Sequence, residues 1–416
     1  MIRTREEPPM SADIILITIS SVILVSYLFD FFSSRTRVPQ LVFLILSGII
    51  VRVLMDRAGW HIPYLGVILP PLGTLGLILI VLEAGLDLEL GRDKVEVIRN
   101  SLFSAFFSLL ATLGLIAAFY KLLFPSAGLR LCLVNALPLA VMSSAIAIPG
   151  VSHLPADRKE FIVYESSFSD ILGILVFNFL VLNETFGFGA YFSFGFEIIA
   201  TILLSLVFSL ALAALIERID HKIKYLPVFS VLLLVYALAK MMHFSPLVLV
   251  LVFGLFANNI GKFVRGNLRF YLDVDRLREE MDQFGGIVRE TTFVIKTFFF
   301  LLLGYSTDLR ELFAPDAFRV ALPVLGFIYL GRWLPLRRAA GGAAHSLAYI
   351  APRGLITVLL YLSIPPALHM PGIPAAALVL LILATALILA WGVMKPDTPA
   401  QARLKRIISG DFNEQP

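Results

Sequence analysis

Cysteine is almost absent from this 416-residue chain, and charged side chains are few. The one cysteine, Cys132, lies in an apolar run, which excludes an intramolecular disulfide framework. With six scattered histidines and one cysteine, the chain also lacks the ligand set of a zinc site. Charged residues form 15% of the sequence, whereas soluble domains carry about 25%. These shortages argue against a disulfide-stapled domain, a zinc enzyme and an ordinary soluble domain.

Apolar residues take the place of the missing charge. They make up 58% of the chain, and the mean hydropathy is +0.88. One soluble core cannot bury so much, so most of these side chains must face lipid or the inside of a helix bundle. We expect an all-α polytopic membrane protein with about 13 transmembrane helices. These are expected at residues 12–32, 38–55, 71–88, 97–123, 129–151, 160–183, 191–216, 225–242, 246–260, 285–304, 317–336, 344–364 and 374–394.

The chain, residues 1–416, is expected to be a single membrane transport domain built from an inverted repeat. Two stretches that lie seven helices apart end alike, one with Gly85 and Asp87 and the other with Gly304 and Asp308. Helices seven apart cross the membrane in opposite directions, as inverted repeats require. The expected parts are an N-terminal tail (1–10) without a cleavable signal peptide, a first six-helix repeat (11–184), a linker helix (190–219), a second repeat (225–394) and a short tail (395–416).

The distribution of Lys and Arg predicts the orientation. When the thirteen helices alternate across the membrane, most basic residues fall on one side, in loops such as those holding Arg35, Arg158, Lys159, Arg337 and Arg338. The positive-inside rule places that side in the cytoplasm. We therefore expect a multi-pass protein of the cell membrane, with its N-terminus outside and its C-terminus in the cytoplasm.

Two of the expected helices contain breaks at matching places. Residues 137–150 include Pro138, Ser143 and Ser144, and the run 351–354 reads Ala-Pro-Arg-Gly. Proline and small polar residues at membrane depth free backbone groups that protein, water or an ion must satisfy. Interrupted helices in corresponding positions of two halves indicate a transport site. The alternative is a simple proline kink in each of two packed helices.

Residues 165–170, with the sequence Glu-Ser-Ser-Phe-Ser-Asp, carry the densest intramembrane polar set. Asp170 is expected about 15–18 Å along its helix, near the midplane, where an ionisable group has a partner or a function. Glu165 is shallower, at the expected depth of Arg332, so we predict a structural ion pair between these two. Asp170 would then remain with the hydroxyls of Ser166 and Ser169, a setting in which a monovalent cation and a proton compete.

Three further charges lie outside this set. Glu83 could line an ion funnel or be an interfacial carboxylate. Lys296 could pair with a carboxylate, support the charge of the site, or pack at a helix crossing with its amine directed toward the interface. Arg353, in the second break, could balance the C-terminal dipoles of half-helices, which is the reading we favour.

These residues resemble the monovalent cation:proton antiporter superfamily over essentially all the spans. Residues 165–170 are similar to the Glu-Ser-Leu-x-Asn-Asp motif of the sodium/proton exchanger branch, and residues 83–86 to its Glu-Ala-Gly-Leu stretch. Gly331-Arg332 and Arg353-Gly354 match two further family positions. The resemblance implies a homodimer, a core with crossed broken helices and elevator-like movement of that core.

The same resemblance implies residue roles. Asp170 would carry the cation and the proton, while Ser166 and Glu83 assist, and Glu165 pairs with Arg332. Two departures leave the cation open among Na⁺, K⁺ and Li⁺. Ser169 stands where the family has Asn or Asp, and Ser143-Ser144 is closer to the potassium-efflux branch. With one carrier acid, we expect electroneutral one-for-one exchange.

Other functional classes remain as alternatives. A gated cation channel or efflux pathway also needs polar breaks, but no filter sequence is repeated. An organic-anion symporter can share the inverted-repeat scaffold. An embedded enzyme lacks any matching motif here. We expect no enzyme activity, cofactor or nucleic-acid partner; the partners are membrane lipid, a monovalent cation and protons.

Overall fold

A computed structural model describes residues 12–60, 65–91, 94–184, 187–218, 225–242, 244–263 and 274–394. Within these ranges the chain is helical and contains no strand. The two predicted tails, at 1–10 and 395–416, lie outside the described residues, as do several of the basic residues that carry the orientation argument.

Each predicted apolar stretch coincides with a helix or with a broken pair of helices. Among the residues that the structure describes, eight helical segments are long and apolar enough to cross a membrane, so the count of thirteen stays a prediction. The main helices are α1 (Ala12–Thr36), α2 (Gln40–Ala58), α3 (Leu65–Asp87), α4 (Val95–Leu123), α5 (Leu129–Ala140), α6 (Ser144–Gly150), α7 (Ala156–Leu182), α8 (Phe188–Arg218), α9 (Tyr225–Met241), α10 (Pro246–Asn258), α12 (Val274–Ser306), α14 (Pro315–Ala340), α16 (Leu355–Leu362) and α17 (Ala375–Met394). Short helices join them: α11 (Ile260–Phe263), α13 (Leu309–Leu312) and α15 (Ala344–Leu347).

The start of α12 differs from the sequence prediction, since the helix begins at Val274 rather than at residue 285. Its first turns carry many charges, so a search for apolar runs excludes them. Leu277, Met281 and Phe284 are nevertheless buried, and their spacing of four and three residues places them on one helical face. This end of α12 is therefore amphipathic rather than wholly apolar.

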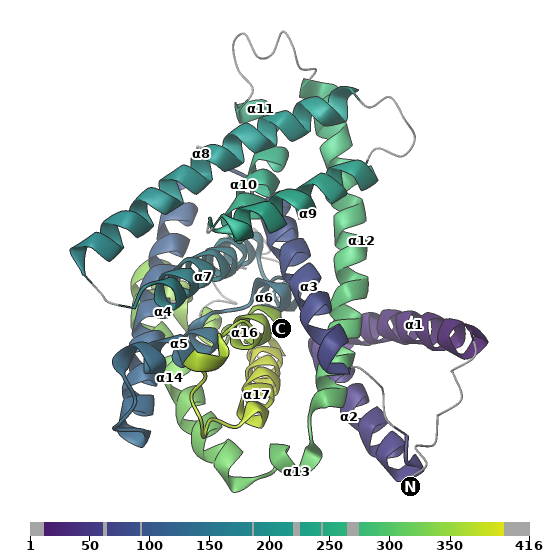
Figure 1. The fold of residues 1–416 in the computed structure, drawn as a ribbon, viewed down its shortest axis with the longest axis vertical. Coiled ribbons are helices and arrows are strands. Elements are labelled where there is room, and N and C mark those ends of the chain that lie inside the picture. Colours follow the sequence, from purple (N-terminus) through teal and green to yellow (C-terminus); the bar gives the residue numbers. More distant parts are fainter. Residues whose placement is uncertain are drawn as a thin grey trace, which may run out of the picture.

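Two interrupted helices cross at the centre of the molecule. The first interruption separates α5 from α6, and the second separates α15 from α16. The backbone N–H of Ser143 donates to the carbonyl of Pro352 at 2.9 Å, which joins the two interruptions directly. Figure 1 shows α16 and α17 beside α5 and α6, although they are distant in sequence. Backbone groups freed by each break thus find a partner in the other.

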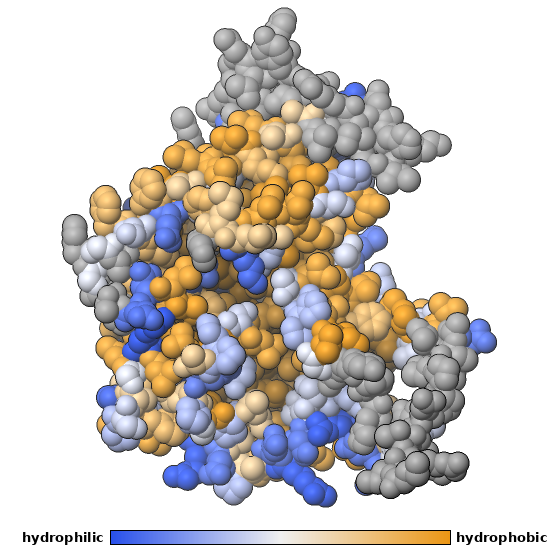
Figure 2. Space-filling model, in the orientation of Figure 1, coloured by the Kyte–Doolittle hydropathy of each residue, from blue (hydrophilic) through white to orange (hydrophobic). Residues whose placement is uncertain are grey.

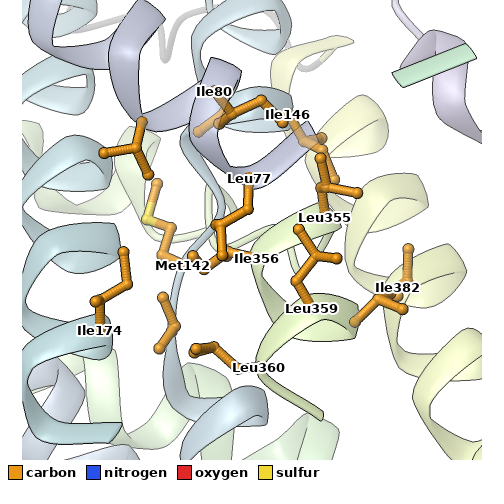
Figure 3. Close-up of a cluster of buried hydrophobic side chains, with 14 of the residues drawn as sticks. Leu77, Ile80, Met142, Ile146, Ile174, Leu355, Ile356, Leu359, Leu360 and Ile382 are labelled. Carbon is orange, nitrogen blue, oxygen red and sulfur yellow. The ribbon is translucent and has the colours of Figure 1, made fainter. Parts of the chain in front are cut away.

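An apolar cluster packs around this crossing. Figure 3 shows its side chains converging from α3, the first interruption, α6, α7, α16 and α17. The labelled members are Leu77, Ile80, Met142, Ile146, Ile174, Leu355, Ile356, Leu359, Leu360 and Ile382, all of them buried. Aliphatic side chains therefore surround the backbone at the two breaks, so few polar groups lie near it.

Glycines bring two helix pairs into close contact. At Gly304 of α12, an added Cβ would lie 2.2 Å from the carbonyl oxygen of Ile45 in α2. At Gly85 of α3, it would lie 2.8 Å from the carbonyl oxygen of Leu251 and 3.0 Å from the Cα of Gly254, both in α10. Only glycine permits this approach, so α2 packs on α12 and α3 on α10 backbone to backbone.

The surface is largely apolar. Figure 2 shows hydrophobic side chains over much of the visible face, with hydrophilic ones gathered at the lower end near α13. On α1, side chains such as Leu16, Leu24 and Leu28 are more than half exposed. A surface of this kind suits contact with lipid rather than with water.

Candidate functional site

Asp170 lies on α7 beside the first helix interruption and is 4% exposed. One of its carboxylate oxygens, Oδ2, accepts a hydrogen bond from the hydroxyl of Ser144 and a longer one, of 3.3 Å, from the backbone N–H of Ser144. The other oxygen, Oδ1, is buried and has no hydrogen-bond partner among the described residues. Half of this carboxylate is therefore held by protein and half is available to a ligand.

A small pocket opens beside Asp170 between α3, α7 and α10. It offers roughly the room of one water molecule. Ser167 and Asp170 are its polar lining residues, and the others are aliphatic: Val81, Ala84, Ile171, Ile174, Leu247, Val248 and Leu251. The lining is therefore mostly hydrocarbon, and its two polar residues both come from α7.

Glu165 and Arg332 form a buried ion pair between α7 and α14. The guanidinium donates to both carboxylate oxygens, at 2.8 Å and 2.7 Å, and the side chains are 1% and 5% exposed. Ser104 of α4 donates a third hydrogen bond to Glu165, at 2.6 Å. This fork-to-fork geometry is the strongest form of a charge-assisted hydrogen bond. Glu165 is thus fully engaged, in contrast to Asp170.

Arg353 occupies the second interruption and binds backbone rather than a carboxylate. Its guanidinium donates to the carbonyls of Leu139 at 2.6 Å and Ala140 at 3.1 Å, the last two residues of α5, and to that of Ala351 at 2.9 Å. The final carbonyls of a helix lack intrahelical partners and carry partial negative charge. The arginine therefore satisfies the end of one broken helix from within the other.

The serines of the sequence-predicted site take different positions. Ser144 contacts Asp170, as described above. Ser166 donates to the carbonyl of Ile162 in its own helix, and Ser169 accepts a hydrogen bond of 2.9 Å from the backbone N–H of Met142 in the first interruption. The hydroxyl of Ser143 is buried and has no partner among the described residues.

Glu83 and Lys296 lie together, away from the pocket lining. Lys296 of α12 approaches Glu83 of α3 at 3.3 Å, and both side chains are about one-fifth exposed. One turn along α3, Asp87 approaches Arg289 of α12 at 3.4 Å. Two ion pairs therefore connect α3 to α12, and Glu83 has a cationic partner of its own.

Two contributors were missing from the sequence-based site. Ser104 lies on α4, whose polar residues Ser101, Ser104, Ser108 and Thr112 recur every three or four positions. That periodicity marks one face of a helix and could have indicated a polar stripe toward α7. Ser167 occupies a position where the resembling motif has leucine, so the motif does not indicate a polar role for it. Its burial beside Asp170 is evident only from the structure.

A family model matches most of the chain, and solved structures match its fold. Residues 19–396 match the family model described as "Sodium/hydrogen exchanger, transmembrane". No curated protein matches the chain. A solved structure of the sodium proton antiporter MjNhaP1 from Methanocaldococcus jannaschii at pH 8 has a TM-score of 0.68 and 20% identity, and covers 92% of this chain and 100% of that chain.

A second structure of MjNhaP1, from an electron-microscopy map, has a TM-score of 0.65 and 18% identity, and covers 98% of this chain and 100% of that chain. At these identities the likeness shows the fold, whereas the family model covers most of the sequence. Proteins of this family are transporters rather than enzymes, and they need no cofactor because the ions are their substrates. The chain is a multi-pass membrane protein that belongs to the sodium/hydrogen exchanger family, whose members exchange cations for protons.

Proposed function

We propose that the protein is a secondary active antiporter in which Asp170 alternately binds a monovalent cation and a proton. The observation that carries this proposal is the half-engaged carboxylate: Oδ1 is buried and has no described hydrogen-bond partner, and Asp170 lines a pocket with room for one small particle. Protein donors reach only Oδ2. One group that binds either a proton or a cation, but not both, couples their movements obligatorily.

Asp170 differs from Glu165 in the charge of its partner. The guanidinium of Arg332 gives Glu165 a permanent positive partner. Asp170 is held by the neutral donors of Ser144, so its negative charge must be balanced by a proton or by a cation from solution. This contrast supports a structural role for Glu165 and the exchange role for Asp170.

The other predicted residues support the site indirectly. Ser143 precedes Ser144, which contacts Asp170, and its buried hydroxyl has no described partner, so we propose it as a further oxygen ligand at the first interruption. Ser169 fixes the backbone of that interruption, Ser166 lies on the same helix, and Glu83 with Lys296 places charge on α3. These residues, together with Arg353, hold the geometry that Asp170 needs.

The proposed cation is Na⁺, with Li⁺ and K⁺ as the alternatives. A hard oxygen site of one carboxylate and several hydroxyls accommodates alkali cations. The family description names sodium, while the serine pair at 143–144 leaves K⁺ open. We further propose one cation for one proton, with the N-terminus outside the cell membrane and the C-terminus in the cytoplasm.

We also propose that the protein forms a homodimer through α1, which is the least buried of the candidate spans among the described residues. Leu24 of α1 is 66% exposed, and Cys132 is buried, so a cysteine placed at position 24 can be cross-linked with little background. Disulfide formation by L24C but not by L334C, whose parent leucine on α14 is 73% exposed, is the expected result. A monomeric mass in lipid nanodiscs would contradict the proposal.

Proteoliposomes with an internal pH dye test the proposed antiport. Addition of Na⁺, Li⁺ or K⁺ outside should drive proton efflux and make the lumen alkaline in the wild type. Asp170→Asn keeps the size of the side chain but cannot carry the charge, so the signal should vanish. Equal signals from the two proteins would remove Asp170 from the mechanism, and a dissipative ion leak without a proton signal would indicate a channel.

A further inference from the structure

Ser167 is a buried hydroxyl that the helix around it does not satisfy. The residue is 1% exposed, and its Oγ has no hydrogen-bond partner among the described residues. Two buried serines on α8 instead donate to a carbonyl one turn back, Ser205 to Thr201 at 2.5 Å and Ser209 to Ser205 at 2.7 Å. A buried polar atom without a partner costs about 1–3 kcal/mol, so an occupant that satisfies it should be sought.

The surroundings of Ser167 identify the occupant. Ser167 and Asp170 are three residues apart on α7, which places them on neighbouring positions of one helical face. They are the polar residues of the small pocket, and the lining contributed by α3 and α10 is aliphatic. Asp170 also lines this pocket, and its Oδ1 is a second buried oxygen without a described partner. Two unpartnered oxygens, one of a carboxylate and one of a hydroxyl, thus belong to residues that line one small space.

We propose that the hydroxyl of Ser167 is a direct ligand of the transported cation, on the side of Asp170 that faces α3 and α10. This inference rests on the proposed carrier role of Asp170. A bound alkali cation accepts the lone pairs of both oxygens, whereas a proton on Asp170 needs only one of them. Ser167 therefore stabilises the cation-loaded form more than the protonated form, and it makes this site richer in oxygen than the motif with leucine at that position.

The position of Ser167 also gives it a role in specificity. A motif with Asp before the carrier acid would provide a second carboxylate. Here that position holds Ser169, whose hydroxyl accepts a hydrogen bond from the backbone N–H of Met142. A neutral hydroxyl adds coordination without adding charge. The cation can thereby lose more of its water while the exchange stays one charge for one charge.

Two substitutions at Ser167 test the proposal in the dye-loaded proteoliposomes. Ser167→Ala should raise the Na⁺ concentration for half-maximal exchange about fivefold, the effect of losing one polar contact, with the maximal rate retained and the Na⁺/Li⁺/K⁺ preference altered. Ser167→Thr, which keeps a hydroxyl, should stay near wild type. Ser205→Ala, which removes a buried hydroxyl on α8, is the matched control and should change neither quantity.

A second measurement does not depend on transport. Na⁺ and Li⁺ should raise the Tm of the purified wild type, because a ligand that binds the folded state stabilises it, and Ser167→Ala should lose most of that shift. Normal cation affinity in both assays for Ser167→Ala, or a lowered maximal rate with unchanged affinity, overturns the role of Ser167 alone. Wild-type protein that shows the Tm shift without exchange would overturn the antiport proposal and leave the cation site standing, while the absence of both overturns both.

Discussion

The buried charges around the helix interruptions have three different kinds of partner. Glu165 has a guanidinium, Arg353 has backbone carbonyls, and Asp170 has the hydroxyl and amide of Ser144. Among the described residues, Glu165 and Asp170 are the buried carboxylates. A carboxylate with a permanent cation as partner belongs to the framework, and one without it is suited to exchange.

Removal of one member of the Glu165–Arg332 pair should damage the fold more than the site. Glu165→Gln leaves the guanidinium buried without its counter-charge, and such a loss destabilises proteins by about 3–5 kcal/mol. We expect a clear fall in the Tm of the detergent-solubilised protein. Asp316→Asn, which breaks an exposed pair with Arg319 on α14, is the control and should leave the Tm unchanged. Equal Tm values for Glu165→Gln and wild type would contradict a structural role.

The sequence predicted part of the site through depth. Counting residues along two helices was enough to predict the pair of Glu165 with Arg332 that the structure contains, while the midplane depth of Asp170 stays a prediction. The same counting could not decide which serine meets Asp170, because that depends on how α6 is rotated at the interruption. Nor could it place Glu83 against Lys296, because the choice of partner depends on the packing of α3 against α12.

Two pairs of helices pack through glycines in the same way. The helix α2 meets α12 through Gly48 and Gly304, and α10 meets α3 through Gly254 and Gly85. In the proposed inverted repeat, α2 corresponds to α10 and α3 to α12, so the two contacts are images of one another. The arrangement supports the proposed repeat, because unrelated helices would have no reason to pack in corresponding pairs.

An added methyl group at Gly304 should separate α2 from α12. Its Cβ would lie 2.2 Å from the backbone oxygen of Ile45, an overlap that no side-chain rotation can relieve. Gly304→Ala should therefore lower the Tm and the yield of folded protein, since overpacking costs about 1–3 kcal/mol. Gly114→Ala on α4 is the matched control, because an added Cβ there meets nothing within 4 Å. A Tm for Gly304→Ala as high as that of Gly114→Ala would contradict this close packing.

Sequence patterns predicted elements better than boundaries. Apolar runs marked the helices because the membrane leaves no other structure for such stretches, and Pro138 with the Ala-Pro-Arg-Gly run marked both interruptions. The amphipathic start of α12 was not predicted, because its charged residues lower the mean hydropathy of any window that also contains the apolar ones. The hydrogen bond from Ser143 to Pro352 that joins the two interruptions is a long-range contact without a local signal.

In the proposed mechanism, Asp170 is the one group among the described residues whose charge balance changes during transport. Glu165 is paired with Arg332, and Glu83 with Lys296, so movement of the core would carry those charges as neutral pairs. Asp170 would be neutralised by a proton in one direction and by a cation in the other. Because both loaded states carry the same total charge, the cycle as a whole should move no net charge.

This balance predicts that exchange is insensitive to membrane potential. In proteoliposomes clamped with potassium and valinomycin, the rate of Na⁺-driven proton movement should be the same at positive, zero and negative potentials. Protein adsorbed on a solid-supported membrane should give no sustained current when a pH gradient is applied in symmetric Na⁺, as should the transport-inactive Asp170→Asn. A wild-type current that reverses sign with the gradient and disappears in Asp170→Asn would mean that a second proton moves with the first, and a further titrating group would then have to share the site with Asp170.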